Sequence, residues 1–164
     1  MIPITITAHN GNPVAYGDAI YKGAKGQTTY KSALITKPDS DERHRNFELF
    51  ISEWPEESGA IVNIRAIKEG RDVYRWVKGD SANKDVLQAD QKNKKGDDMK
   101  FTLSQHKEYW IFQWAGDTGF VSNQKSNQEI LMANQNLGPN PDSEESKSAY
   151  FTVKLNEKKA ESKE

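Results

Sequence analysis

Three aspartates that closely follow a glycine are the residues of this 164-residue chain whose spacing first suggests chemistry. They are Asp18 in GDAIY, Asp72 in GRDVY and Asp117 in GDTGF. Carboxylates that converge can bind a cation or divide the roles of acid and base. A recurring Gly-Asp also suits turns, because Asp accepts hydrogen bonds from backbone amides two residues on and Gly adopts torsions that other residues avoid. We expect the turn role, with direct ligand contact by one aspartate as the alternative.

Other reactive constellations are missing from the sequence. His9, His44 and His106 lack the paired spacing of a metal motif. The acidic stretches 39–43 and 140–146 lack the glycine and terminal glutamate of an EF-hand loop. The chain has no cysteine and no G-x-S-x-G, and YKGAKGQTTY does not have the spacing of a phosphate-binding loop. We therefore expect no metal, no cofactor and no catalytic activity.

The composition narrows the class of protein. The length suits one domain with a substantial core. The net charge is −1, from 23 basic and 24 acidic residues, which excludes the electrostatic footprint of a nucleic-acid binder. No apolar run approaches the roughly 20 residues that span a bilayer, and the first residues do not resemble a signal peptide. We expect a protein that does not span a membrane and is cytoplasmic or released by a leaderless route.

Apolar residues alternate with polar ones over most of the chain. Such runs predict strands, and Gly, Asn, Asp, Pro and Ser clusters between them predict turns. No stretch keeps a helical stripe for three turns, so the predicted fold class is all-β. The dense apolar stretch at 110–114 predicts burial for most of Trp110, Ile111, Phe112 and Trp114. The strand runs are IPITIT, NFELFIS, IVNIRAI, DVYRWV, KFTLSQ, YWIFQW and YFTVKL.

Three landmarks recur in the same order, which predicts an internal repeat. Each aspartate is followed by a leucine after 16, 15 and 14 positions, and that leucine by a phenylalanine after 13, 14 and 20. The longest gap contains LGPNPDSEESKS, which reads as a loop insertion. Each unit also opens on an alternating apolar pair: Ile4 and Ile6, Val62 and Ile64, Phe112 and Trp114. The leucines are Leu34, Leu87 and Leu131, and the phenylalanines are Phe47, Phe101 and Phe151.

Three units of about fifty residues with four short strands each resemble the β-trefoil, a capped barrel of twelve strands. The resemblance covers residues 2–156, so we expect a single β-trefoil domain over 1–156 and a charged, solvated tail over 157–164. Another barrel or a sandwich is the alternative. The stretch 14–20 is similar to fascin-like trefoils, and NGNPVAYGDAIY to Kunitz-type and fungal trefoil inhibitors. The Gln-x-Trp signature of ricin-type lectins is missing, because residues 112–114 read FQW.

Trefoils are mostly binding folds, so the resemblance implies a non-catalytic binding module. Along VYRWVKGD, Tyr74 and Trp76 alternate with Val73, Arg75 and Val77, so one set faces away from the core. Outward rings would form a platform for a sugar or a protein partner. The alternative is that they plug the barrel end beneath EWPEES. The candidate ligand-binding residues are Tyr74, Arg75, Trp76, Trp54 and Asn83.

We expect one of two functions of different kinds for such a binding module. The first is lectin-like recognition of a glycan or glycoprotein, in a defence or toxin component, which the amide-rich SNQKSNQEILMANQNLGPN also suits. The second is protease inhibition through an exposed loop at 137–144, where Pro139, Asn140 and Pro141 would hold an extended backbone. A fascin-like protein-binding module is a further alternative.

Overall fold

The computed structural model describes residues 2–23, 26–53, 60–68, 72–78, 87–91, 100–114, 120–123, 130–135 and 147–156. These residues form strands and one 3-10 turn, η1 (Glu42–His44), so the chain is all-β, as the alternation predicts. The tail predicted at 157–164 lies outside the described residues. The strands are β1 (Ile2–Ala8), β2 (Val14–Gly23), β3 (Gly26–Thr36), β4 (Phe47–Glu53), β5 (Ala60–Lys68), β6 (Asp72–Lys78), β7 (Leu87–Gln91), β8 (Phe101–His106), β9 (Tyr109–Trp114), β10 (Phe120–Asn123), β11 (Leu131–Gln135) and β12 (Phe151–Leu155).

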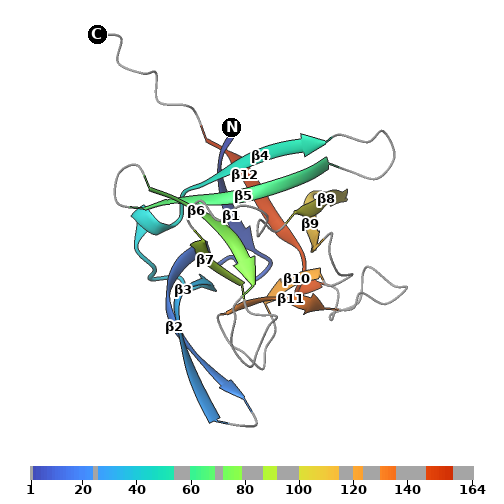
Figure 1. Ribbon diagram of the computed structural model, residues 1–164. Coiled ribbons are helices and arrows are strands. Elements are labelled where there is room, and N and C mark those ends of the chain that lie inside the picture. The colour runs from blue at the N-terminus through green and yellow to red at the C-terminus, as the bar shows by residue number, and fades with distance from the viewer. Residues whose placement is uncertain are drawn as a thin grey trace.

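Six antiparallel strands close into a barrel in the order β1, β4, β5, β8, β9, β12 and back to β1. The first and last strands are neighbours, with Ile6 opposite Val153. Figure 1 shows β1 and β12 side by side, with β4 and β5 crossing them. Each of these six strands pairs on both sides, which removes the exposed edges that invite aggregation.

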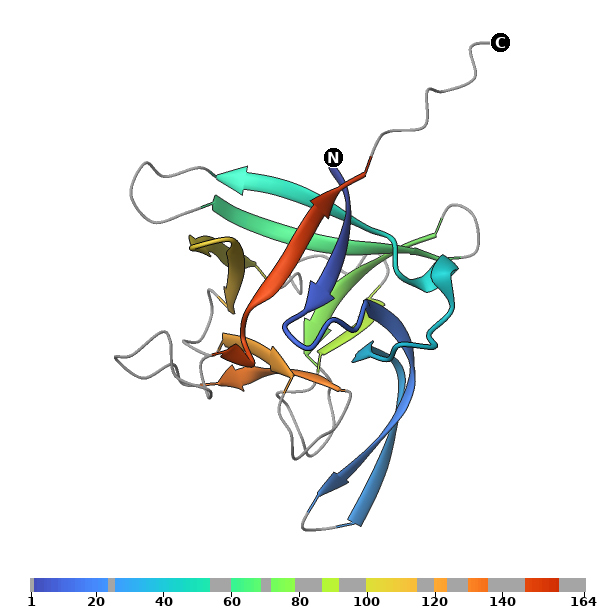
Figure 2. The ribbon, with the colours of Figure 1, turned by 180° about the vertical axis from the view of Figure 1, so that it is seen from behind.

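The other strands form three hairpins, β2–β3, β6–β7 and β10–β11. The hairpin β6–β7 joins the barrel through β5, and β10–β11 joins it through β9. The hairpins also touch one another, because Ala33 of β3 pairs with Gln88 of β7 and Ile35 bridges to Ile130 beside β11. Figure 2 shows them gathered at the end of the barrel away from the chain termini.

One buried cluster forms the main core, and both the barrel strands and the hairpin strands contribute to it. Phe47, Phe101 and Phe151 are the first residues of β4, β8 and β12, and each is at most 1% exposed. Burying a side chain of this size contributes about 1.5–3 kcal/mol. The apolar landmarks seen in the sequence belong to this cluster, as the pattern predicts for a core: Ile4, Ile6, Leu34, Phe47, Val62, Ile64, Leu87, Phe101, Phe112, Leu131 and Phe151.

The first Gly-Asp pair lies inside a strand and not in a turn. Strand β2 continues to Gly23, and its hairpin with β3 turns between Gly23 and Gly26. At Asp18 the register shifts, because Lys31 and Ser32 stand opposite this single residue. Ser32 has φ 52°, and its backbone N–H donates to Asp18 Oδ1 at 3.1 Å. The predicted turn role of Asp18 is therefore wrong: its carboxylate holds a β-bulge across the hairpin.

Gly17 lies in close contact with the Ile35 side chain. A Cβ built at Gly17 would lie 2.9 Å from Ile35 Cδ1, while its φ is not among the positive values of the described residues. The same hairpin contributes most of a second buried cluster. Its members are Ala15, Tyr30, Ala33, Ile35 and Ile130. Of the other two aspartates, Asp72 starts β6 opposite Lys68, and Asp117 lies outside the described residues.

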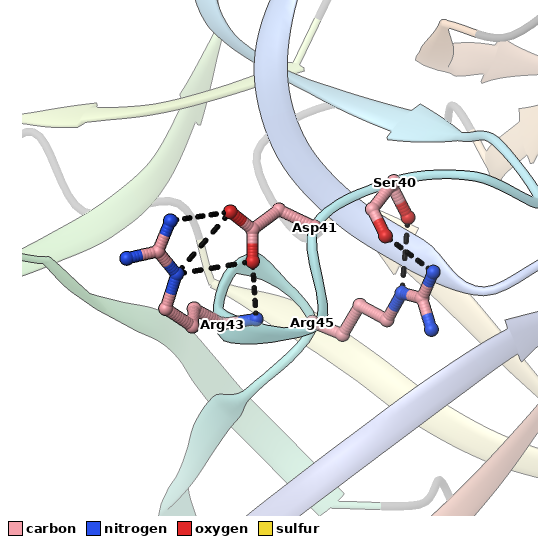
Figure 3. A network of polar contacts seen from close by, with 4 residues as sticks. All are labelled: Ser40, Asp41, Arg43 and Arg45. Carbon is pink, nitrogen blue, oxygen red and sulfur yellow. Dashed lines mark hydrogen bonds and ion pairs between the residues drawn. The ribbon is translucent and has the colours of Figure 1, made fainter.

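The connection from β3 to β4 is a hydrogen-bonded turn around η1 (Figure 3). Asp41 caps η1, since its Oδ1 accepts from Arg43 N at 2.9 Å, and its carboxylate pairs with the Arg43 side chain at 2.7 Å. Arg45 Nε donates to Ser40 Oγ at 3.0 Å, and its Nη2 donates to the carbonyl oxygens of Ser40 and Pro38. The turn presents His44 to β2, where its ring stacks on Tyr16 with centroids 4.4 Å apart.

We expect Asp18→Ala to lower the free energy of unfolding by about 1 kcal/mol, because the bulge loses its side-chain acceptor. Asp18→Asn keeps an Oδ1 at the same place and is the matched control, with most of the stability retained. Urea unfolding followed by circular dichroism measures both. Equal losses in the two variants would show that the hydrogen bond to Ser32 does not hold the bulge.

Hydrogen bonds from the Arg43 side chain, and then from its backbone N–H, hold the pKa of Asp41 well below its usual range. Because the folded pKa is depressed, the capping contribution is present above the ordinary aspartate pKa of about 4 and is lost as the pH falls further. Arg43→Ala should return the Asp41 pKa toward its ordinary value in a carboxyl-carbon NMR titration. Arg45→Ala, in the same turn, should leave it unchanged. An ordinary Asp41 titration in the unaltered protein would contradict the pairing.

Candidate functional site

The tip of the β8–β9 hairpin brings two rings together. His106 and Tyr109 are directly opposite, joined by a two-residue turn in which Lys107 has φ 55°. Side chains at opposed positions of an antiparallel pair lie on the same face. Phe101 and Leu103 point into the core from alternate positions of β8, so His106 is on the outer face of the hairpin. Both rings are half-buried.

A segment far along the chain supplies the third ring. Tyr150, immediately before β12, is 3% exposed and stacks on Tyr109 with centroids 5.4 Å apart and planes 18° from parallel. It also lies 5.4 Å from the His106 ring. A backbone hydrogen bond of 3.1 Å from Tyr150 N to Lys147 O closes the turn that places it. The buried Tyr150 ring thus supports the partly exposed ring of Tyr109 and fixes its position.

We call the rings of His106, Tyr109 and Tyr150 the Tyr109 surface. Exposed Lys107 and Glu108 adjoin it on the hairpin tip, and exposed Lys147 adjoins it in the turn before Tyr150. A ring face beside ammonium, carboxylate and phenol groups combines apolar contact with directed hydrogen bonds. This arrangement is suited to holding a ligand that has both apolar faces and hydroxyl groups.

Another aromatic ring lies on the outer face of the barrel, and an arginine side chain covers one of its faces. Phe50 of β4 is 40% exposed, and Arg65 Cζ of β5 lies 5.2 Å from its ring centroid. This cation–π contact takes up one face of the ring. Tyr109 also has one face covered, but by a buried neutral ring, and it has exposed polar side chains from two segments beside it, so we take the Tyr109 surface as the candidate site.

The aromatic pair predicted in strand β6 is placed by backbone register alone. Tyr74 lies opposite Ala66 and Trp76 opposite Ala89, and both alanines are fully buried. The register fixes the backbone of both residues, and the choice between barrel plug and outward platform stays a prediction. Arg75 lies opposite Arg65. The side chains of all three predicted residues are outside the described part of the structure, and the platform stays a prediction.

The remaining predicted residues lie outside the described ranges. These are Trp54, Asn83, Pro139, Asn140 and Pro141. Burial predicted for the stretch at 110–114 holds for Ile111 and Phe112, whereas Trp110 is half-buried against the core. Of Trp114 only the backbone is described.

The Tyr109 surface was missed in the sequence, although two signals point to it. Tyr150 and Phe151 are adjacent, so a period of two turns one ring inward and the other outward. His106 and Tyr109 flank two residues between alternating runs, which is the spacing of a tight hairpin. Neither signal says that the two places meet in space.

The described residues contain no group of three or more His, Asp or Glu side chains placed to hold a metal ion. Within the same residues, no helix has the length and apolar character needed to cross a bilayer.

No known family pattern matches the chain, and no curated protein is similar to it in sequence. Solved structures do match. Cry35Ab1 superposes with a TM-score of 0.62 at 10% identity, covering 95% of this chain and 36% of that one. The Polyporus squamosus lectin, bound to the human-type influenza-binding epitope Neu5Aca2-6Galb1-4GlcNAc, superposes with a TM-score of 0.56 at 16% identity, covering 93% and 48%. The chain therefore spans less than half of either protein. At these identities the likeness is one of fold, and the chain is of the β-trefoil type.

Proposed function

We propose that this protein is a non-catalytic carbohydrate-binding module and that the Tyr109 surface is its sugar site. One observation carries the proposal: the Tyr109 ring is half-buried and is fixed by stacking on the buried Tyr150. A ring that is already ordered loses little conformational entropy on binding. It can therefore cover the apolar face of a sugar at low cost, while Lys107, Glu108 and Lys147 are placed to reach hydroxyl groups.

The fold supports the same class of function. The Polyporus squamosus lectin was solved with a glycan epitope bound, and its overlap with this chain covers almost all of the chain. Within this proposal the protein serves as a recognition part of a defence or toxin system. Protease inhibition through 137–144, which lies outside the described ranges, and a fascin-like protein-binding role are the alternatives.

We further propose three units of four strands, β1–β4, β5–β8 and β9–β12. The first and last strands of each unit are the six that close the barrel. Strands β7 and β11 read LQADQ and LMANQ, and each has an extra residue at its fourth position, where the register with β6 or β10 shifts. Matching bulges at matching letters support a common origin for the second and third units.

We expect Tyr109→Ala to weaken glycan binding by about tenfold or more, because truncating a central ring of a site typically costs over 1 kcal/mol. A glycan array on the unaltered protein identifies the ligand, and isothermal titration calorimetry then compares variants. Tyr109→Phe retains the ring and should retain most of the affinity. Phe50→Ala removes an exposed ring elsewhere and should leave binding unchanged.

Two results would remove this proposal: an array with no bound glycan, or equal losses in Tyr109→Ala and Phe50→Ala with both variants folded by circular dichroism. Stoichiometric inhibition of serine or cysteine proteases, abolished by cleavage within 137–144, would establish the inhibitor alternative in its place.

The Tyr109 surface also predicts how many glycan molecules each chain binds. Residues that precede Phe47 and Phe101 as Tyr150 precedes Phe151 are Asn46 and Lys100, which lack a ring. Native mass spectrometry should therefore find one glycan per chain at saturation. Two or three glycans per chain would show that the units bind alike and that the Tyr109 surface is not what selects the ligand.

A further inference from the structure

The β2–β3 hairpin extends beyond the rest of the fold as an arm, which we define as residues 19–31. Past the bulge at Asp18, five register pairs run from Ala19 opposite Tyr30 to Gly23 opposite Gly26. Figures 1 and 2 both show this end of β2 and β3 projecting away from the barrel. The pairing of β3 with β7 lies at Ala33, next to the base of the arm, and Gln88 Nε2 of β7 also donates to the backbone oxygen of Lys31 at 2.9 Å. The arm is thus a two-stranded ribbon, a structure that is marginal alone in water.

The arm is strongly basic in a protein that is not. Residues 19–31 contain three lysines and no acidic residue, although the chain as a whole has a net charge of −1. Lys22 belongs to β2, and Lys31 belongs to β3 and is exposed. Lys25 falls in the connection between the two strands, outside the described residues. Such segregation of charge predicts an anionic partner for this end of the molecule.

One face of the arm also carries an exposed apolar side chain. Ile20 is 55% exposed and lies opposite Thr29, which is exposed too. The other face is anchored, since Tyr30 is 3% exposed within the second buried cluster and Ala19 packs against that cluster. The described part of the ribbon is therefore amphipathic, with the exposed Ile20 and Lys31 on the face away from the cluster.

We propose that the arm binds the surface of an anionic lipid bilayer. Lysines near such a surface are attracted by its negative potential, and an exposed aliphatic side chain gains by entering the headgroup boundary. A second copy of the chain is a poorer partner for the open strand edges, because two arms of like charge repel. A soluble acidic polysaccharide would neutralise the lysines but leave Ile20 in water.

Co-sedimentation of the full chain with vesicles tests the proposal. Vesicles of phosphatidylcholine with about 30% phosphatidylserine should bind at least about tenfold more protein than pure phosphatidylcholine. Binding should fall as salt rises, since screening shortens the reach of surface charges. Lys22→Gln with Lys31→Gln should weaken binding about fivefold for each lysine. Ile20→Ser should weaken it several-fold while leaving the charge unchanged.

Matched controls are available on the barrel. Leu155 is 66% exposed and Lys154 and Lys100 are exposed, so Leu155→Ser and the pair Lys154→Gln with Lys100→Gln repeat the same changes away from the arm. They should bind vesicles as the unaltered protein does. Equal binding to neutral vesicles, or equal losses in arm and barrel variants, would overturn the proposal. The protein could instead be retained more strongly on heparin than on anionic vesicles, with Ile20→Ser leaving this retention unchanged. That result would assign the arm to an acidic polysaccharide.

This inference does not depend on the sugar site. Arm variants should keep any glycan binding, and Tyr109→Ala should keep vesicle binding, so the two proposals fail separately. Thermal melting of each variant confirms that it is folded.

Discussion

Barrel closure is the constraint on which the rest of this structure depends. The ring of six strands is completed where β1 meets β12, in a register that runs from Ile4 opposite Leu155 to Ala8 opposite Phe151. Closure encloses the phenylalanines that begin β4, β8 and β12, and it fixes the outer face of β8–β9. Tyr150 immediately precedes β12, so the same pairing that seals the core also delivers the base ring of the Tyr109 surface. The stability of the barrel and the position of the Tyr109 surface therefore both depend on the pairing of β12 with its neighbours.

Much of the fold could be read from the chain, because a period of two is a direct consequence of the pleat. Leu34, Leu87 and Leu131 were predicted as recurring apolar landmarks, and all are fully buried. The local chemistry of the first hairpin was not recognisable. Gly-Asp at 17–18 has turn composition, yet β2 runs through it, since the close approach to Ile35 and the bonded Ser32 let the strand bend without ending. Tertiary contacts override local propensity at such places.

The candidate site was less accessible to prediction. Tyr109 and Tyr150 stack although they are 41 positions apart in the chain, and that meeting depends on β9 pairing with β12 through Trp110 and Phe151. Alternation assigns a residue to a face but does not say which distant residue shares that face. In strand β6 alternation allows either face for Tyr74 and Trp76, and the backbone register places these residues opposite Ala66 and Ala89.

The nearness of β1 to β12 also bears on how the molecule is made. A contact such as Thr5 Oγ1 to Asn156 Oδ1 joins residues 151 positions apart, and contacts of this range slow folding because a large loop must close before they form. During synthesis β1 emerges first and its partner last. Until the ribosome releases β12, one side of β1 has no strand beside it. Until then β1 has an open sheet edge, which pairing with β12 closes in the finished barrel.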